Sequence, residues 1–102
     1  MGPITLTRIG RVELPHGYEL EEVGKNLLLK RPNGYVLAVF GDGVKPDNVR
    51  RVAEMDEKYM RALDREEKFG VGADSETVLM FGEDVKGARM EFLLALEAAY
   101  RE

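Results

Sequence analysis

The spacing of apolar residues changes once along this chain, at Pro46, and this change constrains the fold more than any other feature. Before Pro46, apolar residues skip one position, as in Ile4/Leu6 and Val12/Leu14, which is typical of strands with one buried face. After Pro46 they recur at steps of three and four residues, which is typical of amphipathic helices. The order of the two patterns predicts a single α+β domain over residues 1–102.

Turn residues divide the first part of the chain into short segments. Pro15-His16-Gly17 and Gly24-Lys25-Asn26 interrupt it on either side of Tyr18–Val23. The clearest turn is Arg31-Pro32-Asn33-Gly34-Tyr35, where proline presets φ and glycine can take a positive φ as a bulge. We therefore expect an antiparallel β-meander of four or five short strands from Ile4 to Phe40.

The bulged turn also predicts the register of the hairpin that it closes. The expected cross-strand pairs are Arg31/Tyr35, Leu29/Leu37 and Leu27/Val39. One side of the ribbon then carries Leu27, Leu29, Leu37 and Val39, and the other carries Leu28, Lys30, Val36, Ala38 and Phe40. A two-residue Asn-Gly loop would exchange the faces of one strand. Such a loop needs a backbone N–H donor at position 32, and Pro32 lacks one.

A first long helix is expected from Pro46 to Gly70. Proline is tolerated in a first helical turn, and glycine can end a helix in a left-handed conformation. The polar face offers acid–base pairs four residues apart, each worth about 0.2 to 0.5 kcal/mol. These pairs are Glu54/Lys58, Glu57/Arg61 and Asp64/Lys68.

A second long helix is expected to begin at the N-cap residues Asp74-Ser75 and to continue to about Arg101. The alternative makes Thr77–Phe81 a strand that stops at Gly82. Glycine costs about 1 kcal/mol in a helix interior, which keeps the alternative open, but the apolar spacing favours the helix. The expected architecture is a meander with both helices packed on one of its faces.

The composition excludes several classes of protein. The chain has no cysteine, so disulfides, thiol nucleophiles and thiolate metal sites are impossible. Ser75 and His16 are the sole serine and histidine, which nearly excludes a nucleophilic triad. The first residues lack a basic-then-apolar pattern, so we expect no leader peptide, and no apolar run approaches the roughly 20 residues that span a bilayer. We expect a cytoplasmic protein with no cofactor and no metal, and the absence of glutamine beside abundant Glu, Lys and Arg suggests a thermophilic source.

The strand-to-helix joint Gly41-Asp42-Gly43, followed by Lys45, is the one candidate ligand site. Free amides at a helix N-terminus favour an anion, and Lys45 would add positive charge. The joint matches neither the phosphate-binding loop nor the dinucleotide fingerprint, because Pro46 stands where the latter needs a third glycine. Glycines at such joints more often provide backbone freedom alone, and we favour a plain connection.

Two ionisable residues have a structural interpretation. His16 lies between proline and glycine, and we expect an exposed turn histidine rather than a base or a ligand. Asp56 falls on the edge of the apolar stripe of the first helix, and we expect it to meet an arginine. Neither residue predicts acid–base catalysis.

The last helix is apolar over well over half of its circumference between Met90 and Tyr100. Either the helix is sandwiched between the sheet and the first helix, or part of it is an exposed apolar patch that binds a second subunit or another protein. The predicted interface residues are Phe92, Leu93, Leu96 and Tyr100.

These features predict a small non-enzymatic interaction or regulatory protein that forms a homodimer through its last helix. The first alternative is an anion-binding or small-molecule domain that uses Gly41-Asp42-Gly43. The second is a nucleic-acid-binding accessory protein that uses Arg50-Arg51, Lys30-Arg31 and Lys45, with Tyr35 as a stacking surface. The net charge of −4 argues against nucleic acid, and a membrane surface is not expected, because the polar positions of the last helix are mainly acidic.

Overall fold

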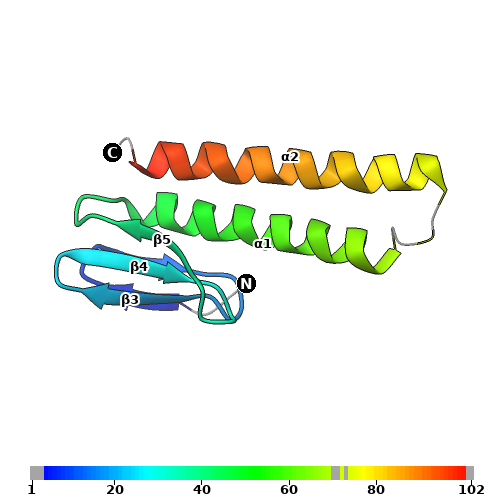
Figure 1. Ribbon diagram of the computed structural model, residues 1–102. Coiled ribbons are helices and arrows are strands. Elements are labelled where there is room, and N and C mark those ends of the chain that lie inside the picture. Colours follow the sequence, from blue (N-terminus) through cyan, green and yellow to red (C-terminus); the bar gives the residue numbers. More distant parts are fainter. Residues whose placement is uncertain (1–3, 70–71, 73, 101–102) are drawn as a thin grey trace.

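The computed structural model describes residues 4–69, 72 and 74–100, and it has an α+β architecture (Figure 1). Five strands precede two helices, which confirms the predicted fold class. The strands are β1 (Ile4–Thr7), β2 (Gly10–Glu13), β3 (Glu19–Val23), β4 (Asn26–Lys30) and β5 (Val36–Phe40). The helices are α1 (Pro46–Phe69) and α2 (Ser75–Tyr100).

The five strands form two antiparallel sheets instead of the expected single meander. One sheet pairs β1 with β2, and the other has the order β3-β4-β5. The turn after Leu14 carries the chain from one sheet to the other, and the Tyr18 amide donates to the Pro15 carbonyl at 3.1 Å. Gly17 has a φ of +88°, and a Cβ there would meet the Pro32 ring at 3.0 Å. The chain therefore turns tightly against the β4-β5 hairpin where a direct β2-β3 ladder was expected.

The predicted turn at Arg31–Tyr35 is confirmed, but the register beyond it is different. The Gly34 amide donates to the Arg31 carbonyl at 2.8 Å, the Arg31 amide donates to the Tyr35 carbonyl at 2.9 Å, and Gly34 has a φ of +88°. A second irregularity follows, since Lys30 pairs with Val36 whereas Leu29 pairs with Ala38. Leu37 is the extra residue of a β-bulge.

This bulge exchanges the faces of β5. The predicted pairs Leu29/Leu37 and Leu27/Val39 are wrong, because Leu27 faces Phe40 and Leu28 faces Val39. Leu27, Leu29, Ala38 and Phe40 are consequently buried, and Val36 and Val39 are exposed. The bulge buries the large Phe40 ring in place of the smaller Val39 side chain, so more apolar surface leaves water.

Both helices begin where the sequence predicts, and the expected end of α2 near Arg101 lies outside the described residues. α1 begins at Pro46, and its expected end at Gly70 lies outside the described residues. α2 is a continuous helix that includes Thr77–Phe81, so the strand alternative is wrong. Asp74 is its N-cap, because its side-chain oxygen accepts the Thr77 amide at 2.9 Å.

The helices lie on the same side of the sheets, and α1 is placed between the sheets and most of α2 (Figure 1). Buried side chains from both sheets and both helices form one core, which includes Val12, Leu14, Leu27, Leu29, Phe40, Val49, Val52, Phe92, Ala95 and Ala99. The C-terminal half of α2 contributes to this core. The other half of α2 and the end of α1 project beyond the sheets, which gives the molecule extents of 49 × 25 × 21 Å.

Ion pairs on the helices partly follow the sequence prediction. Glu57–Arg61 and Asp64–Lys68 are present at 3.4 and 3.1 Å. Lys58 pairs with Glu91 of α2 at 2.8 Å instead of with Glu54. This bond joins the two helices along one flank.

Replacement of Gly34 by alanine tests the hairpin turn. Because Gly34 has a positive φ and open space around it, Gly34→Ala should lower the free energy of unfolding by about 1 to 2 kcal/mol through backbone strain alone. Gly43→Ala is the matched control, since Gly43 also has open space but no positive φ. Urea denaturation measures both variants, and equal stabilities would contradict the assigned turn.

The Asp74 cap makes the stability of α2 depend on pH. The hydrogen bonds from Thr77 hold the pKa of Asp74 below its ordinary value of 3.8. A lowered pKa in the folded state means that the carboxylate stabilises the fold above pH 3.8 and loses this effect as the pH falls through the lowered value. Asp74→Ala should therefore have a lower melting temperature than the wild type at pH 7, and the difference should shrink on acidification, because the protonated carboxyl keeps only a neutral capping oxygen. Asp74→Asn keeps a capping oxygen that does not titrate and should retain its advantage over Asp74→Ala in acid; a pH-independent gap between wild type and Asp74→Ala would contradict the cap.

Candidate interaction surface

Asp56 is fully buried in the centre of α1 and is held by two side chains from the β region. The Arg31 guanidinium donates to both carboxylate oxygens, from Nε to Oδ2 at 3.0 Å and from Nη2 to Oδ1 at 2.8 Å. The Tyr18 hydroxyl donates to Oδ2 at 2.7 Å. The predicted meeting of Asp56 with an arginine is thus confirmed, and we call Asp56, Arg31 and Tyr18 the clasp.

The electrostatics of the clasp suit a structural role. Burial, followed by the hydrogen bond to Asp56, raises the pKa of Tyr18, and the hydrogen bond to Asp56 raises the pKa of Arg31. The Tyr35 ring lies 4.9 Å from the Arg31 guanidinium carbon and adds a cation–π contact. Neither raised pKa is near neutrality, so Tyr18 remains a donor and Arg31 a cation. The clasp therefore holds α1 against the β region through a donor and a cation that keep their protons at physiological pH.

The Gly41–Lys45 joint is exposed except for Val44. Neither Gly41 nor Gly43 has a positive φ, and an added Cβ would meet nothing within 4 Å at either position. A cavity of about 250 Å³ adjoins the joint, lined by Phe40, Gly41, Gly43, Val44, Ala99 and Tyr100. Asp42 and Lys45 do not line this cavity. The joint therefore does not gather charge around a pocket, and anion binding stays a prediction.

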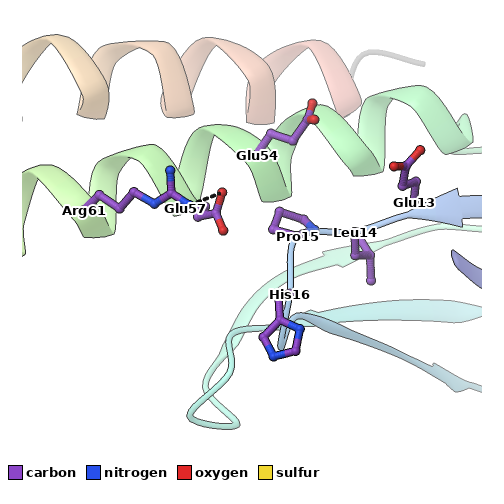
Figure 2. Close-up of a pocket in the computed structure, with 7 residues that line it drawn as sticks. All are labelled: Glu13, Leu14, Pro15, His16, Glu54, Glu57 and Arg61. Carbon is purple, nitrogen blue, oxygen red and sulfur yellow. Dashed lines mark ion pairs between the residues drawn. The ribbon is translucent and has the colours of Figure 1, made fainter. Parts of the chain in front are cut away.

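A second cavity, of about 260 Å³, lies between α1 and the segment that follows β2 (Figure 2). It is lined by Glu13, Leu14, Pro15, His16, Glu54, Glu57 and Arg61. The His16 ring points away from Glu54 and Glu57, and Glu57 already pairs with Arg61. Within the described part of the chain, no group of three or more His, Asp or Glu side chains is placed to hold a metal ion.

The basic residues predicted for nucleic-acid binding already have acidic partners in several cases. Arg31 belongs to the clasp, Lys30 pairs with Glu21 at 2.5 Å, and Arg50 lies 3.7 Å from Glu54. Each of these pairs would have to break before the cation could bind a phosphate. Nucleic-acid binding stays a prediction that the geometry does not favour.

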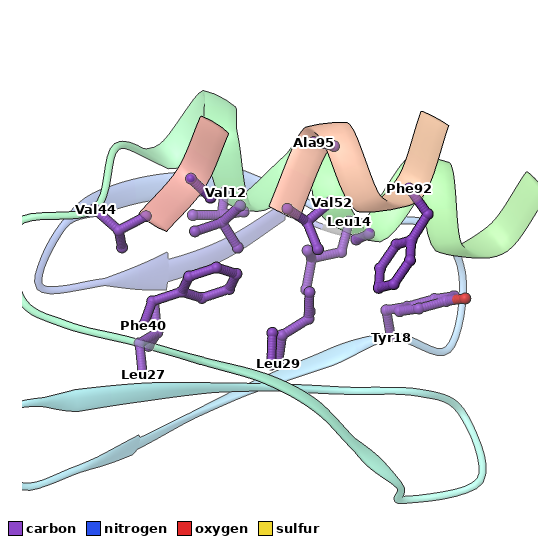
Figure 3. Close-up of a cluster of buried hydrophobic side chains, with 14 residues drawn as sticks. Val12, Leu14, Tyr18, Leu27, Leu29, Phe40, Val44, Val52, Phe92 and Ala95 are labelled. Atoms are coloured by element: carbon purple, nitrogen blue, oxygen red, sulfur yellow. The ribbon is translucent and has the colours of Figure 1, made fainter. Parts of the chain in front are cut away.

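The two faces of α2 differ in burial. The inner face packs Ala88, Phe92, Ala95 and Ala99 into the chain, and Figure 3 shows the Phe92 ring close to Tyr18 in the core. The outer face exposes Met90, Leu93 and Leu94, whose exposed fractions are 58%, 43% and 58%. We call these three side chains the outer patch.

The predicted interface residues divide between these two faces. Phe92 is buried and its ring stacks with Tyr59 at 6.4 Å between centroids, and Leu96 is partly buried against the core. Leu93 and Tyr100 remain exposed, although the Tyr100 ring also contacts Phe40 at 5.7 Å. Spacing alone did not single out Met90 and Leu94. They could have been found as the large apolar residues that lie across the helix from the Ala88, Phe92, Ala95 stripe.

Comparison with protein-family models, with curated proteins and with solved structures finds no significant match to this chain. Neither described helix is long and apolar enough to cross a membrane.

Loss of the Asp56 carboxylate tests the clasp. Asp56→Ala leaves the Arg31 guanidinium without its partner in a largely buried site, and we expect a loss of about 3 kcal/mol in the free energy of unfolding. Tyr18→Phe removes one donor to a buried carboxylate and should cost about 1.5 kcal/mol. Tyr35→Phe is the control, because its exposed hydroxyl is not part of the clasp. Chemical denaturation measures all three, and a neutral Asp56→Ala would refute the role assigned to the clasp.

Proposed function

We propose that this protein is a small non-enzymatic interaction protein that forms a homodimer through the outer face of α2. The observation that carries the proposal is the exposure of Met90, Leu93 and Leu94 as neighbours on a well-formed helix. Apolar surface gains about 25 cal/mol per Å² when it leaves water. Contiguous exposed patches of this kind are characteristic of interaction sites.

A second copy of the chain can cover the outer patch through a two-fold symmetric interface. Lys86, Met90, Leu93 and Glu97 follow one another at steps of four, three and four residues, so they line one side of the helix. We call these four residues the outer stripe. It has a basic residue at one end and an acidic residue at the other, with apolar residues between them. Two copies related by a two-fold axis would bring Met90 and Leu93 of both chains together in the middle of the interface.

The buried polar groups support a binding rather than a catalytic role. Asp56, Arg31 and Tyr18 are committed to one another. The cytoplasmic location and the thermophilic source stay predictions from composition, and the dimer does not depend on either.

A glutamate in the centre of the outer patch tests the proposal. Wild-type protein should have a solution mass of about 23 kDa, twice the 11.5 kDa of one chain, and Leu93→Glu should be monomeric. Phe69→Glu is the matched control, because Phe69 is an exposed apolar residue at the end of α1 and should keep the dimer. Light scattering coupled to gel filtration gives the masses, and far-UV circular dichroism verifies that each variant is folded. A monomeric wild type, or a dimeric Leu93→Glu, would refute the proposed interface.

A further inference from the structure

We propose that the cavity between the β5–α1 joint and the end of α2 binds a small neutral aromatic molecule. We call it the joint cavity. The joint and the C-terminal end of α2 lie at the same end of the molecule (Figure 1). The cavity has a volume of about 250 Å³ and is lined by Phe40, Gly41, Gly43, Val44, Ala99 and Tyr100. None of the three residues of the outer patch lines it, so this inference goes beyond the proposed homodimer and does not depend on it.

Two aromatic rings line the joint cavity. Phe40 is buried and lies close to Val44 at one end of the core (Figure 3), whereas Tyr100 is 54% exposed. The centroids of the two rings are 5.7 Å apart, and their planes are inclined at 45°. Aromatic rings at such separations attract one another through burial and through their quadrupoles. The exposed part of Tyr100 can therefore pack against one further ring.

The two glycines of the joint keep the cavity open. Neither Gly41 nor Gly43 has a positive φ, and an added Cβ would meet nothing within 4 Å at either position. Neither the backbone nor the packing of the chain therefore requires glycine there, although glycine at an ordinary φ lowers stability by leaving the unfolded chain freer. Close approach of a ligand to the backbone does require a missing side chain. A flat molecule against the peptide groups of the joint accounts for both glycines.

The lining of the joint cavity favours a small uncharged ligand. None of the described residues that line it is charged, and Asp42 and Lys45 of the joint lie outside the lining. A charged group would lose water there without gaining a partner. The volume is also below the range of about 300 to 1,000 Å³ that is typical of pockets for larger ligands. The chemical class is therefore a neutral aromatic compound of one or two fused rings, for which indole is a suitable probe.

Titration with indole, followed by proton–nitrogen correlation NMR spectroscopy of the full chain, tests the site. The amide signals of Gly41, Gly43 and Ala99 should shift and saturate together, whereas the signal of Gly34, at the other end of β5, should not move. Inorganic phosphate should give no saturable shift. Saturable shifts with phosphate and none with indole would overturn the proposal in favour of an anion site. Indole shifts confined to the outer patch would also overturn it.

Substitutions in the lining locate the bound ring. Gly43→Leu should weaken indole binding by roughly tenfold or more, because the new side chain occupies the cavity, and the open space and ordinary φ at Gly43 should let the variant fold. Tyr100→Ala should also weaken binding, and Tyr100→Phe should restore it, because the ring is retained. Tyr35→Ala is the matched control, since it removes an exposed tyrosine at the hairpin tip.

The dissociation constants from the same titration decide the outcome. Wild-type affinity in both Gly43→Leu and Tyr100→Ala would overturn the joint cavity as the binding site. Leu93→Glu should bind indole as the wild type does, because Leu93 does not line the cavity. A monomeric wild type that still binds indole would remove the homodimer and leave this inference intact.

Discussion

The buried contact between Asp56 and Arg31 is the interaction on which the arrangement of this molecule depends. An unpaired carboxylate inside a protein is strongly unfavourable, and Asp56 is fully buried. It is tolerated because Arg31 and Tyr18 supply three donors at 2.7 to 3.0 Å. Arg31 comes from the β4-β5 turn and Tyr18 from the entry to β3. One side chain of α1 thus fixes the helix against two separate points of the β region, and α2 takes its position from α1.

The sequence predicted the parts of the fold that local chemistry determines. Proline, asparagine and glycine define the turn at Arg31–Tyr35, Asp74 defines the start of α2, and Asp56 on the edge of an apolar stripe indicated an arginine partner. Each of these features is specified within a few residues or by the high cost of an unpaired charge. These features could therefore be predicted from the sequence alone.

The parts that were missed depend on contacts between distant segments. Both faces of the β4-β5 ribbon are largely apolar, so the pattern could not reveal that a bulge at Leu37 turns Phe40 inward. The division into two sheets depends on how the β2-β3 turn packs on Pro32. In α2, apolar residues surround much of the helix, and only the packing of the core distinguishes the buried Phe92 from the exposed Met90 and Leu94. The predicted interface residues on α2 therefore included Phe92, which the core buries, and omitted Met90 and Leu94, which are exposed; the interface itself stays a prediction.

We propose that the outer face of α2 is buried against a second copy. Small-angle X-ray scattering tests it most directly, because it gives mass and shape together for the unmodified chain. A single chain has a Cα radius of gyration of 15.2 Å. The dimer predicts a scattering mass of about 23 kDa, twice 11.5 kDa, and a clearly larger radius of gyration that falls on dilution below the dissociation constant. A mass of 11.5 kDa with a radius of gyration close to that of the single chain at every concentration would contradict the claim.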